Sequence, residues 1–166
     1  MKNLILTIST LLLTITISAQ TVVDAAVSNK DFSTLVTALK AADLVGALSG
    51  EGPFTVFAPN NDAFAKLDSE TLENLLKPEN VKTLSNILTY HVVSGKLMAS
   101  DVTKALKTGY GKTKLTALNG QTLVARSKGD KIFLKDKNGN MSEVVATDVV
   151  GTNGVIHVID SVVMPE

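Results

Sequence analysis

Histidine is the side chain best suited to proton transfer and metal binding near neutral pH, and the sequence has two, His91 and His157. Because it has no cysteine, a metal site or a general base would have to use one of these imidazoles or carboxylates alone. The nearest His/Asp pair, His157 and Asp160, lies three positions apart in a predicted strand, so the two side chains point to opposite faces. Local spacing therefore gives no catalytic pair.

Extended catalytic motifs are also missing from the sequence. The sequence has no nucleophile elbow, no glycine-rich phosphate loop and no HExxH run, and only the fold could bring Ser94 or Asp62 to His91. A histidine in an apolar strand is more often a hydrogen-bonded core residue than a ligand. We therefore interpret both histidines as structural, and predict a protein that is not an enzyme and has no catalytic residues, no metal site and no cofactor.

Positive charge is concentrated between Lys96 and Lys137, where nine lysines and one arginine outnumber three aspartates. The whole chain has no formal net charge, so the excess is local. Several of these cations fall on neighbouring predicted hairpins, where some must lie close together: Lys112, Lys114, Arg126, Lys128, Lys131, Lys135 and Lys137. The first five of them form a tentative binding site.

Two interpretations of this basic segment stay open. The patch could bind an anionic polymer such as acidic polysaccharide, lipopolysaccharide or released DNA. Alternatively, it is an ordinary solvated face whose edge lysines discourage strand-to-strand aggregation. Tyr110 and Phe133 are the only aromatic residues nearby, so the segment does not predict base stacking or specificity for nucleic acid.

The elements that must position these residues change character halfway along the chain. The first half is predicted to be helical, apart from one strand at 54–58 that stops at Pro59. The predicted helices are one capped by Asp31, a short continuation at 41–48, one capped by Asn60 or Asn61 with Asp62 in its first turn, one around 72–76 and one that begins at Pro78.

The second half is predicted to consist of strands. They are expected at 90–93, 113–118, 121–126, 131–135, 142–150 and 155–163. Asn119-Gly120 predicts a hairpin with a type I′ turn, because the two residues tolerate the positive φ angles that this turn requires. Together these elements predict an α+β fold with about seven strands in a wedge or sandwich and a cluster of N-terminal and middle helices.

The first 19 residues have the composition of a signal peptide. Lys2 is followed by an apolar run at 4–17 and then by Ser18 and Ala19, which predicts cleavage after Ala19. The alternative is an uncleaved membrane anchor, but the run is shorter than the ~20 residues that a membrane span needs. We therefore expect a signal peptide at 1–19, one domain at 20–166 with no membrane span, and a secreted, extracellular or periplasmic location.

Three segments resemble signature motifs of the fasciclin (FAS1) family, in matching order and spacing. GPFTVFAPNNDAF at 52–64 looks like the family's first box, ILTYHVV at 87–93 like its Tyr-His segment and NGVIHVID at 153–160 like its second box. The likeness covers nearly all of the chain after residue 19. Five residues of the two boxes are expected to have structural roles: Thr55, Asn60, Asp62, Gly154 and His157.

The resemblance implies a non-catalytic extracellular interaction module, because the family is associated with cell–cell and cell–matrix adhesion and with surface polymers. In animal members the Tyr-His segment is implicated in receptor binding, which makes Tyr90 and His91 tentative binding residues. Their apolar neighbours favour burial instead, and we expect the His91 imidazole to bond to a polar group at 55–62. The expected partner is a cell-surface or matrix protein or an acidic polysaccharide.

Two other hypotheses remain. One is a small-molecule or polymer-binding protein that uses a groove between helices and sheet; the other is a hydrolase with an unrecognised site. A cavity of several hundred Å³ lined by apolar groups would favour a small ligand, whereas a flat charged face would favour a polymer.

Overall fold

A seven-stranded sheet forms the centre of the fold in the computed structural model, which describes residues 20–166. The strands are β1 (Phe54–Pro59), β2 (Val92–Ser94), β3 (Lys112–Thr116), β4 (Thr122–Lys128), β5 (Lys131–Lys135), β6 (Met141–Gly151) and β7 (Gly154–Ile159). Their order is β2-β1-β7-β6-β5-β4-β3; β1 and β7 pair in parallel and the other neighbours are antiparallel. The predicted signal peptide lies outside the described residues.

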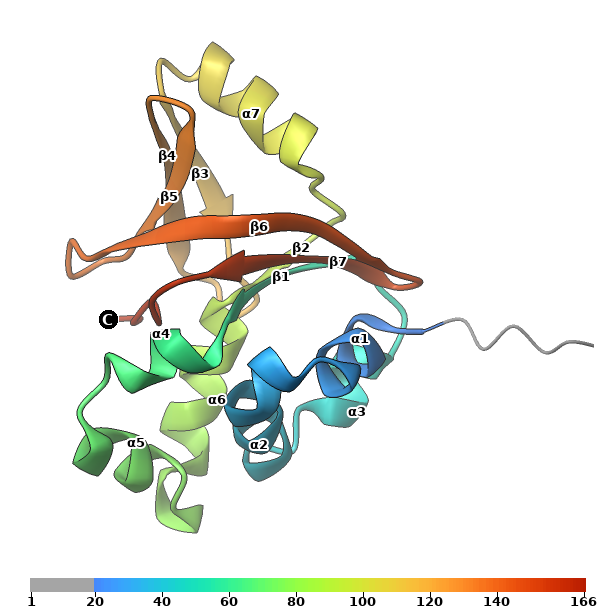
Figure 1. Ribbon diagram of the computed structural model, residues 1–166, viewed down its shortest axis with the longest axis vertical. Coiled ribbons are helices and arrows are strands. Elements are labelled where there is room, and N and C mark those ends of the chain that lie inside the picture. The colour runs from blue at the N-terminus through green and yellow to red at the C-terminus, as the bar shows by residue number, and fades with distance from the viewer. Residues whose placement is uncertain (1–19) are drawn as a thin grey trace, which may run out of the picture.

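Helices cover the sheet unevenly (Figure 1). α1 to α6 gather on one side of β1, β6 and β7, whereas α7 lies on the other side, across from β3 to β5. The bounds are α1 (Val22–Ser28), α2 (Ser33–Ala41), α3 (Val45–Ser49), α4 (Asn61–Ala65), α5 (Ser69–Leu75), α6 (Val81–Tyr90) and α7 (Ala99–Thr108), with 3-10 turns at Lys30–Phe32 and Pro78–Asn80. The predicted α+β class and the seven strands are confirmed.

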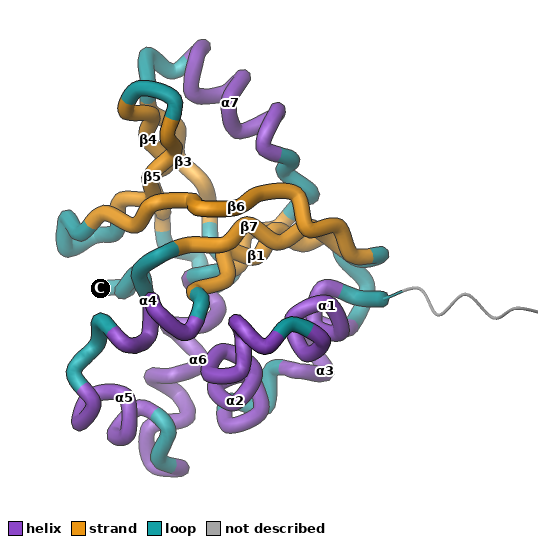
Figure 2. Tube along the Cα trace, viewed as in Figure 1, coloured by secondary structure: helices purple, strands orange, loops and turns teal. Residues whose placement is uncertain are grey.

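The sheet curls until its two ends meet. An isolated bridge joins Val93 of β2 to Ala117, just after β3, and the Leu118 N–H donates to the Val92 carbonyl at 2.7 Å. In Figure 2, β3 to β5 rise away from the plane of β1, β6 and β7. The result is a nearly closed barrel with one apolar core inside it and a second core between the sheet and α1 to α6.

The alternation of side chains along each strand divides apolar residues between these two cores. In β7, Ile156 faces the helices whereas Ile159 lies with Phe57 in the inner core, as the period-two pattern predicts. Val102 and Leu106 of α7 close the inner core from above. Each fully buried side chain of this size contributes ~1.5–3 kcal/mol, so α7 is held by its apolar stripe.

The predicted hairpin between β3 and β4 is confirmed, but its turn type is not. Gly120 has a φ of 82°, whereas Asn119 does not adopt a positive φ. The Gly120 N–H donates to the Ala117 carbonyl and the Ala117 N–H to the Gln121 carbonyl, both at 2.9 Å. This is a three-residue loop with glycine as its left-handed residue. The Asn119 amide docks on Asn86 of α6 at 3.0 Å, which favours the longer loop.

Two helix ends also differ from the prediction. The segment 90–93 is not a strand from its start, because Tyr90 ends α6 and β2 begins at Val92. Asp31 does not cap α2; it lies in a 3-10 turn, where the Asn29 side chain accepts its N–H at 2.9 Å. The cap of α2 comes instead from a distant residue, since Asn61 Oδ1 accepts the N–H of Thr34 at 3.1 Å.

Helices α1 and α7 were not predicted. α1 begins with a capping box in which Thr21 Oγ1 accepts the Asp24 N–H at 3.2 Å and the Asp24 carboxylate accepts the Thr21 N–H at 2.9 Å. α7 is rich in lysine and threonine, and its buried side is only Val102 and Leu106. The sequence signals were therefore present but short: a Thr-x-x-Asp box in α1, and in α7 one i, i+4 apolar pair next to Asp101.

Candidate functional site

The five cations named from the sequence lie on the outward side of β3, β4 and β5. Side chains alternate along a strand, and Leu115, Leu123 and Leu134 point into the inner core. Residues an odd number of positions away point outward, and these are exposed: Lys112, Lys114, Arg126, Lys128 and Lys131. We call these five residues together with the half-buried Lys135 the basic face.

Strand pairing brings like charges together on the basic face. Lys112 lies directly opposite Arg126, and Lys128 directly opposite Lys131. Opposed like charges destabilise an antiparallel pair, so fold stability does not account for this arrangement. Among the outward positions of the paired segments of β3 to β6, all within the described residues, Glu143 is the one carboxylate. It forms an ion pair with Lys131 at 2.7 Å. The remaining cations are left to attract anions.

A depression of about 330 Å³ lies at the β3–β4 end of the basic face. Three of its lining residues carry positive charge and the others are neutral: Gly109, Lys112, Thr113, Lys114, Val124 and Arg126. An anionic group that enters this depression can approach more than one cation at once.

The Tyr-His segment is buried. Tyr90 has no exposed surface and its hydroxyl donates to the Thr122 carbonyl at 3.1 Å; burial raises the pKa of its phenol. The His91 ring lies 2.8 Å from the Ile87 carbonyl through Nδ1, and its Nε2 accepts the N–H of Val163 at 3.2 Å. Neither side chain presents an atom to a partner, so this geometry gives no support to their tentative binding role.

The two hydrogen bonds determine the protonation of His91. Because Nε2 accepts from Val163, the proton lies on Nδ1, which donates to the Ile87 carbonyl. Burial lowers the pKa of His91 to about 4, opposed in part by the bond to Ile87. The predicted side-chain partner at 55–62 was wrong: only the backbone carbonyl of His91 meets that strand, accepting the Phe57 N–H at 2.8 Å.

Two residues of the signature boxes, His157 and Thr55, hold the backbone of Leu97 between them. His157 Nε2 lies 2.7 Å from the Leu97 carbonyl, and the buried Thr55 hydroxyl accepts the Leu97 N–H at 2.9 Å. His157 Nδ1 accepts the Asp148 N–H at 3.4 Å, and its ring packs on Phe57 with centroids 5.6 Å apart. Both residues therefore fix the segment that leads into α7.

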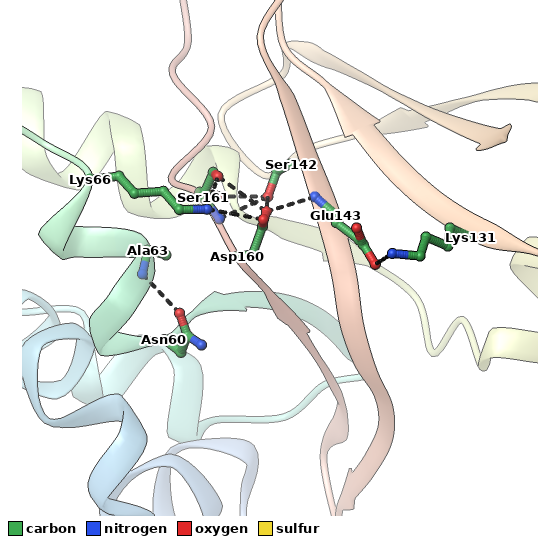
Figure 3. A network of polar contacts seen from close by, with 8 residues as sticks. All are labelled: Asn60, Ala63, Lys66, Lys131, Ser142, Glu143, Asp160 and Ser161. Atoms are coloured by element: carbon green, nitrogen blue, oxygen red, sulfur yellow. Dashed lines mark hydrogen bonds and ion pairs between the residues drawn. The ribbon is translucent and has the colours of Figure 1, made fainter.

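Asn60 and Asp62 lie at the turn from β1 into α4. Asn60 Oδ1 accepts the N–H of Ala63 at 2.8 Å, which makes Asn60 the N-cap, one of the two alternatives predicted (Figure 3). Asp62 is exposed in the first turn of the helix.

A serine, a lysine and an aspartate do meet near the end of β7 (Figure 3). Lys66 Nζ lies 3.0 Å from Asp160, which also accepts the Glu143 N–H at 2.8 Å. Burial opposes ionisation, but these bonds hold the pKa of Asp160 below its usual value. The Ser142 hydroxyl donates to the Ser161 carbonyl at 2.8 Å, and Lys66 is ion-paired rather than a free base. The cluster therefore suits a structural tie between β6, β7 and α4.

The two signature boxes interlock where β1 and β7 begin. Phe54 pairs with Gly154, and a Cβ on Gly154 would lie 2.2 Å from the Phe54 carbonyl oxygen. The side chain of Asn153 accepts the Val22 N–H at 2.9 Å and donates to the Leu48 carbonyl at 2.8 Å. These partners lie 131 and 105 positions away along the chain, so no local pattern in the sequence indicates the two contacts.

A depression of about 610 Å³ adjoins this junction. Its lining is mostly glycine and short polar side chains: Thr21, Ser49, Gly50, Glu51, Gly52, Pro53, Lys96, Thr152, Asn153 and Gly154. It therefore lacks the large apolar and aromatic side chains that typically line a small-molecule site. Within residues 20–166, no three His, Asp or Glu side chains are grouped to hold a metal ion. In the same range, no helix has the length and apolar composition needed to cross a bilayer.

These observations define an α+β domain in which one sheet curls around an inner core, is backed by a helical layer and exposes a basic face. The chain belongs to the fasciclin family, since the model of the Fasciclin domain matches residues 30–165.

Similar proteins come from bacteria and animals. The chain is 50% identical over 148 residues to protein sll1483 of Synechocystis sp., covering 89% of this chain and 75% of that protein. It is 35% identical over 146 residues to the immunogenic protein MPB70 of Mycobacterium bovis, covering 85% and 67%. It is 37% identical over 145 residues to human periostin, covering 82% of this chain but only 15% of periostin.

The fold also matches a solved structure, a FAS1 domain pair from the insect cell adhesion molecule Fasciclin I. The TM-score is 0.76 at 21% sequence identity, over 87% of this chain and 51% of that one. At this identity the match establishes the shared fold.

Proposed function

We propose that this protein is an exported, non-catalytic adhesion module that contacts acidic polymers of the cell surface or matrix through its basic face. The observation that carries the proposal is the placement of Lys112 opposite Arg126 and of Lys128 opposite Lys131 on one exposed sheet surface. This costs sheet stability and concentrates positive potential, which suits an anionic partner. Membership of a family that includes a cell adhesion molecule supports the same function.

A polymer suits this surface better than a small molecule. The cations are spread over three strands rather than gathered around one cavity, and the depression at the β3–β4 end contains only three of them. At physiological salt, charges separated by more than a Debye length of ~8 Å are largely screened, so each exposed charge contributes little to binding. Tight binding therefore needs many such contacts along a polymer chain. An acidic polysaccharide supplies such repeated charges, and an acidic matrix protein is the alternative partner.

Replacing Lys112, Lys114, Lys128 and Lys131 together with glutamine is expected to abolish binding to an acidic polysaccharide and to leave the fold intact. Exposed ion pairs contribute only ~0–1 kcal/mol each, and the variant loses one such pair, Lys131–Glu143. Affinity for polygalacturonate should be measured at low and high salt, together with urea unfolding. Wild-type binding should weaken as salt rises.

A matched control removes the same charge from the helical side of the molecule. Lys30, Lys40, Lys77 and Lys82 are exposed and lie in or beside α1 to α6. Their replacement by glutamine should leave binding near the wild-type value. Equal affinity of the wild type and the basic-face variant would refute the proposed function.

Export is tested by the mass of the mature protein. The apolar run at 4–17 and the small residues Ser18 and Ala19 predict that exported protein begins at Gln20, with or without cyclisation to pyroglutamate. Intact-mass spectrometry of protein from the medium or the periplasm measures this directly. Material that retains residues 1–19 would contradict cleavage and favour the membrane-anchor alternative.

A further inference from the structure

Tyr110 is 98% exposed and has a left-handed backbone with a φ of 53°. The other tyrosine, Tyr90, is fully buried. Bulky residues rarely adopt positive φ, because Cβ meets the following carbonyl oxygen. Such outliers often mark functional sites, since the fold alone does not select them.

The turn that holds Tyr110 is well defined. It follows α7, and the Gly111 N–H donates to the Leu106 carbonyl at 2.8 Å, which is the bond of a Schellman cap. Tyr110 occupies the left-handed position of that cap, where glycine is the usual residue. Glycine is present on both sides of it, at 109 and 111, but not at this position. Stability would favour glycine at 110, so a different requirement is needed to explain the tyrosine.

The neighbours of Tyr110 line two different depressions. Gly109 belongs to the depression of about 330 Å³ on the basic face, with Lys112, Lys114 and Arg126. Gly111 belongs to a second depression, of about 380 Å³, between α7 and the β4–β5 turn. The charged residues of its lining are Lys107, Lys131 and Asp130. Consecutive Cα atoms are ~3.8 Å apart, so the backbone of Tyr110 connects the edges of the two depressions.

We infer that Tyr110 and the two depressions form an extended site for a linear acidic polysaccharide, with the tyrosine ring stacked on one sugar between two charged subsites. This inference rests on the proposed function and deepens it by naming the ligand class and a specific contact. The face of an aromatic ring is electron-rich and attracts the C–H groups on the apolar side of a sugar. Lys107 on one side, and Lys112, Lys114 and Arg126 on the other, would meet the carboxylates or sulfates.

A sugar chain fits the site better than the two other classes of polyanion. The carboxylates of an acidic peptide would pair with the lysines without any contact to the exposed tyrosine ring. Single-stranded nucleic acid is bound by a series of aromatic residues on which successive bases stack. Here one fully exposed aromatic stands between the subsites, and Phe133, the other aromatic of this segment, is half-buried.

The test compares three variants on three polymers of similar charge: polygalacturonate, poly-L-glutamate and poly(dT). Tyr110→Gly should weaken binding to polygalacturonate about 3- to 10-fold, the loss of one aromatic contact, and leave poly-L-glutamate unchanged. Tyr110→Phe keeps the ring and should bind like the wild type. The quadruple lysine variant should lose affinity for polygalacturonate and for poly-L-glutamate. Tyr110→Gly should also raise the Tm, because glycine relieves the left-handed strain.

The outcomes separate this inference from the proposed function. If Tyr110→Gly binds polygalacturonate as tightly as the wild type while the lysine variant does not, the tyrosine site is refuted and the basic face stands. If the lysine variant also binds like the wild type, the proposed function fails with it. Tyr110-dependent binding that is tighter for poly(dT) than for polygalacturonate would replace the sugar with nucleic acid. A loss of polygalacturonate binding together with a higher Tm supports the inference, since a structural role would not raise stability.

Discussion

Replacing Gly154 with alanine is expected to destabilise the protein by about 3 kcal/mol or more, enough to unfold a marginally stable domain. The added Cβ would lie 2.2 Å from the Phe54 carbonyl oxygen and 2.9 Å from its carbonyl carbon. Both are backbone atoms of the neighbouring parallel strand, so no side-chain rotation relieves the contact. Strands β1 and β7 would have to separate where they start, and both cores depend on this pair.

Gly46→Ala is the matched control for this substitution. Gly46 lies in α3, and a Cβ there would meet no atom within 4 Å apart from the backbone of its own helix and its chain neighbours. Alanine in a helix is favoured over glycine by ~0.5–1 kcal/mol, so this variant should be slightly more stable than the wild type. The free energy of unfolding in urea should therefore move in opposite directions for the two variants. A Gly154→Ala protein with the wild-type midpoint would show that the junction tolerates a wider spacing.

Local patterns in the sequence predicted the strands that meet at this junction, but not their pairing. The run at 54–58 and the run after Gly154 each have strand character on their own. Their parallel pairing joins residues 100 positions apart. The side chain of Asn153 likewise bonds to the backbone of Val22 and Leu48, both more than 100 positions away. A residue such as Asn153, which favours turns, gives no local sign that its side chain also joins α1 to α3.

The basic face could be predicted from local sequence patterns, whereas the Tyr110 turn could not. The predicted hairpins already indicated that some of these lysines lie close together, and the structure places Lys112 opposite Arg126 and Lys128 opposite Lys131. By contrast, α7 was not predicted, because only two of its ten residues, Val102 and Leu106, are buried. Without that helix, Tyr110 had no cap to occupy, and its left-handed backbone could not be predicted.

Acid is expected to destabilise the protein through His91, by about 2–3 kcal/mol between pH 7 and pH 4.5. In the unfolded chain this imidazole takes up a proton below its usual pKa of 6.5, whereas in the folded protein burial lowers the pKa to about 4. Between these values the unfolded state binds more protons, so stability is complete above pH 6.5 and is lost as the pH falls toward 4. The free energy of unfolding in urea, measured across this range, gives the slope.

The hydrogen bonds of His91 explain why the folded protein resists protonation. Its Nε2 accepts the Val163 N–H, and a second ring proton would turn this contact into two opposed donors. The ring is buried, so water cannot replace the lost acceptor. Protonation is therefore expected to release the segment after β7, where Val163 belongs to the inner core.

His91→Asn separates this titration from other effects of acid. The asparagine amide nitrogen can take the place of Nδ1 and donate to Ile87, but the side chain is too short to reach Val163. The variant should lose ~1–3 kcal/mol at pH 7, because the Val163 N–H is left unpaired, and should show little further loss down to pH 4.5. Asp160, whose pKa lies below its usual value of 3.8, adds its own acid dependence only below this range. If His91→Asn kept the wild-type slope, another group would carry the acid sensitivity and the neutral, buried His91 would not be its source.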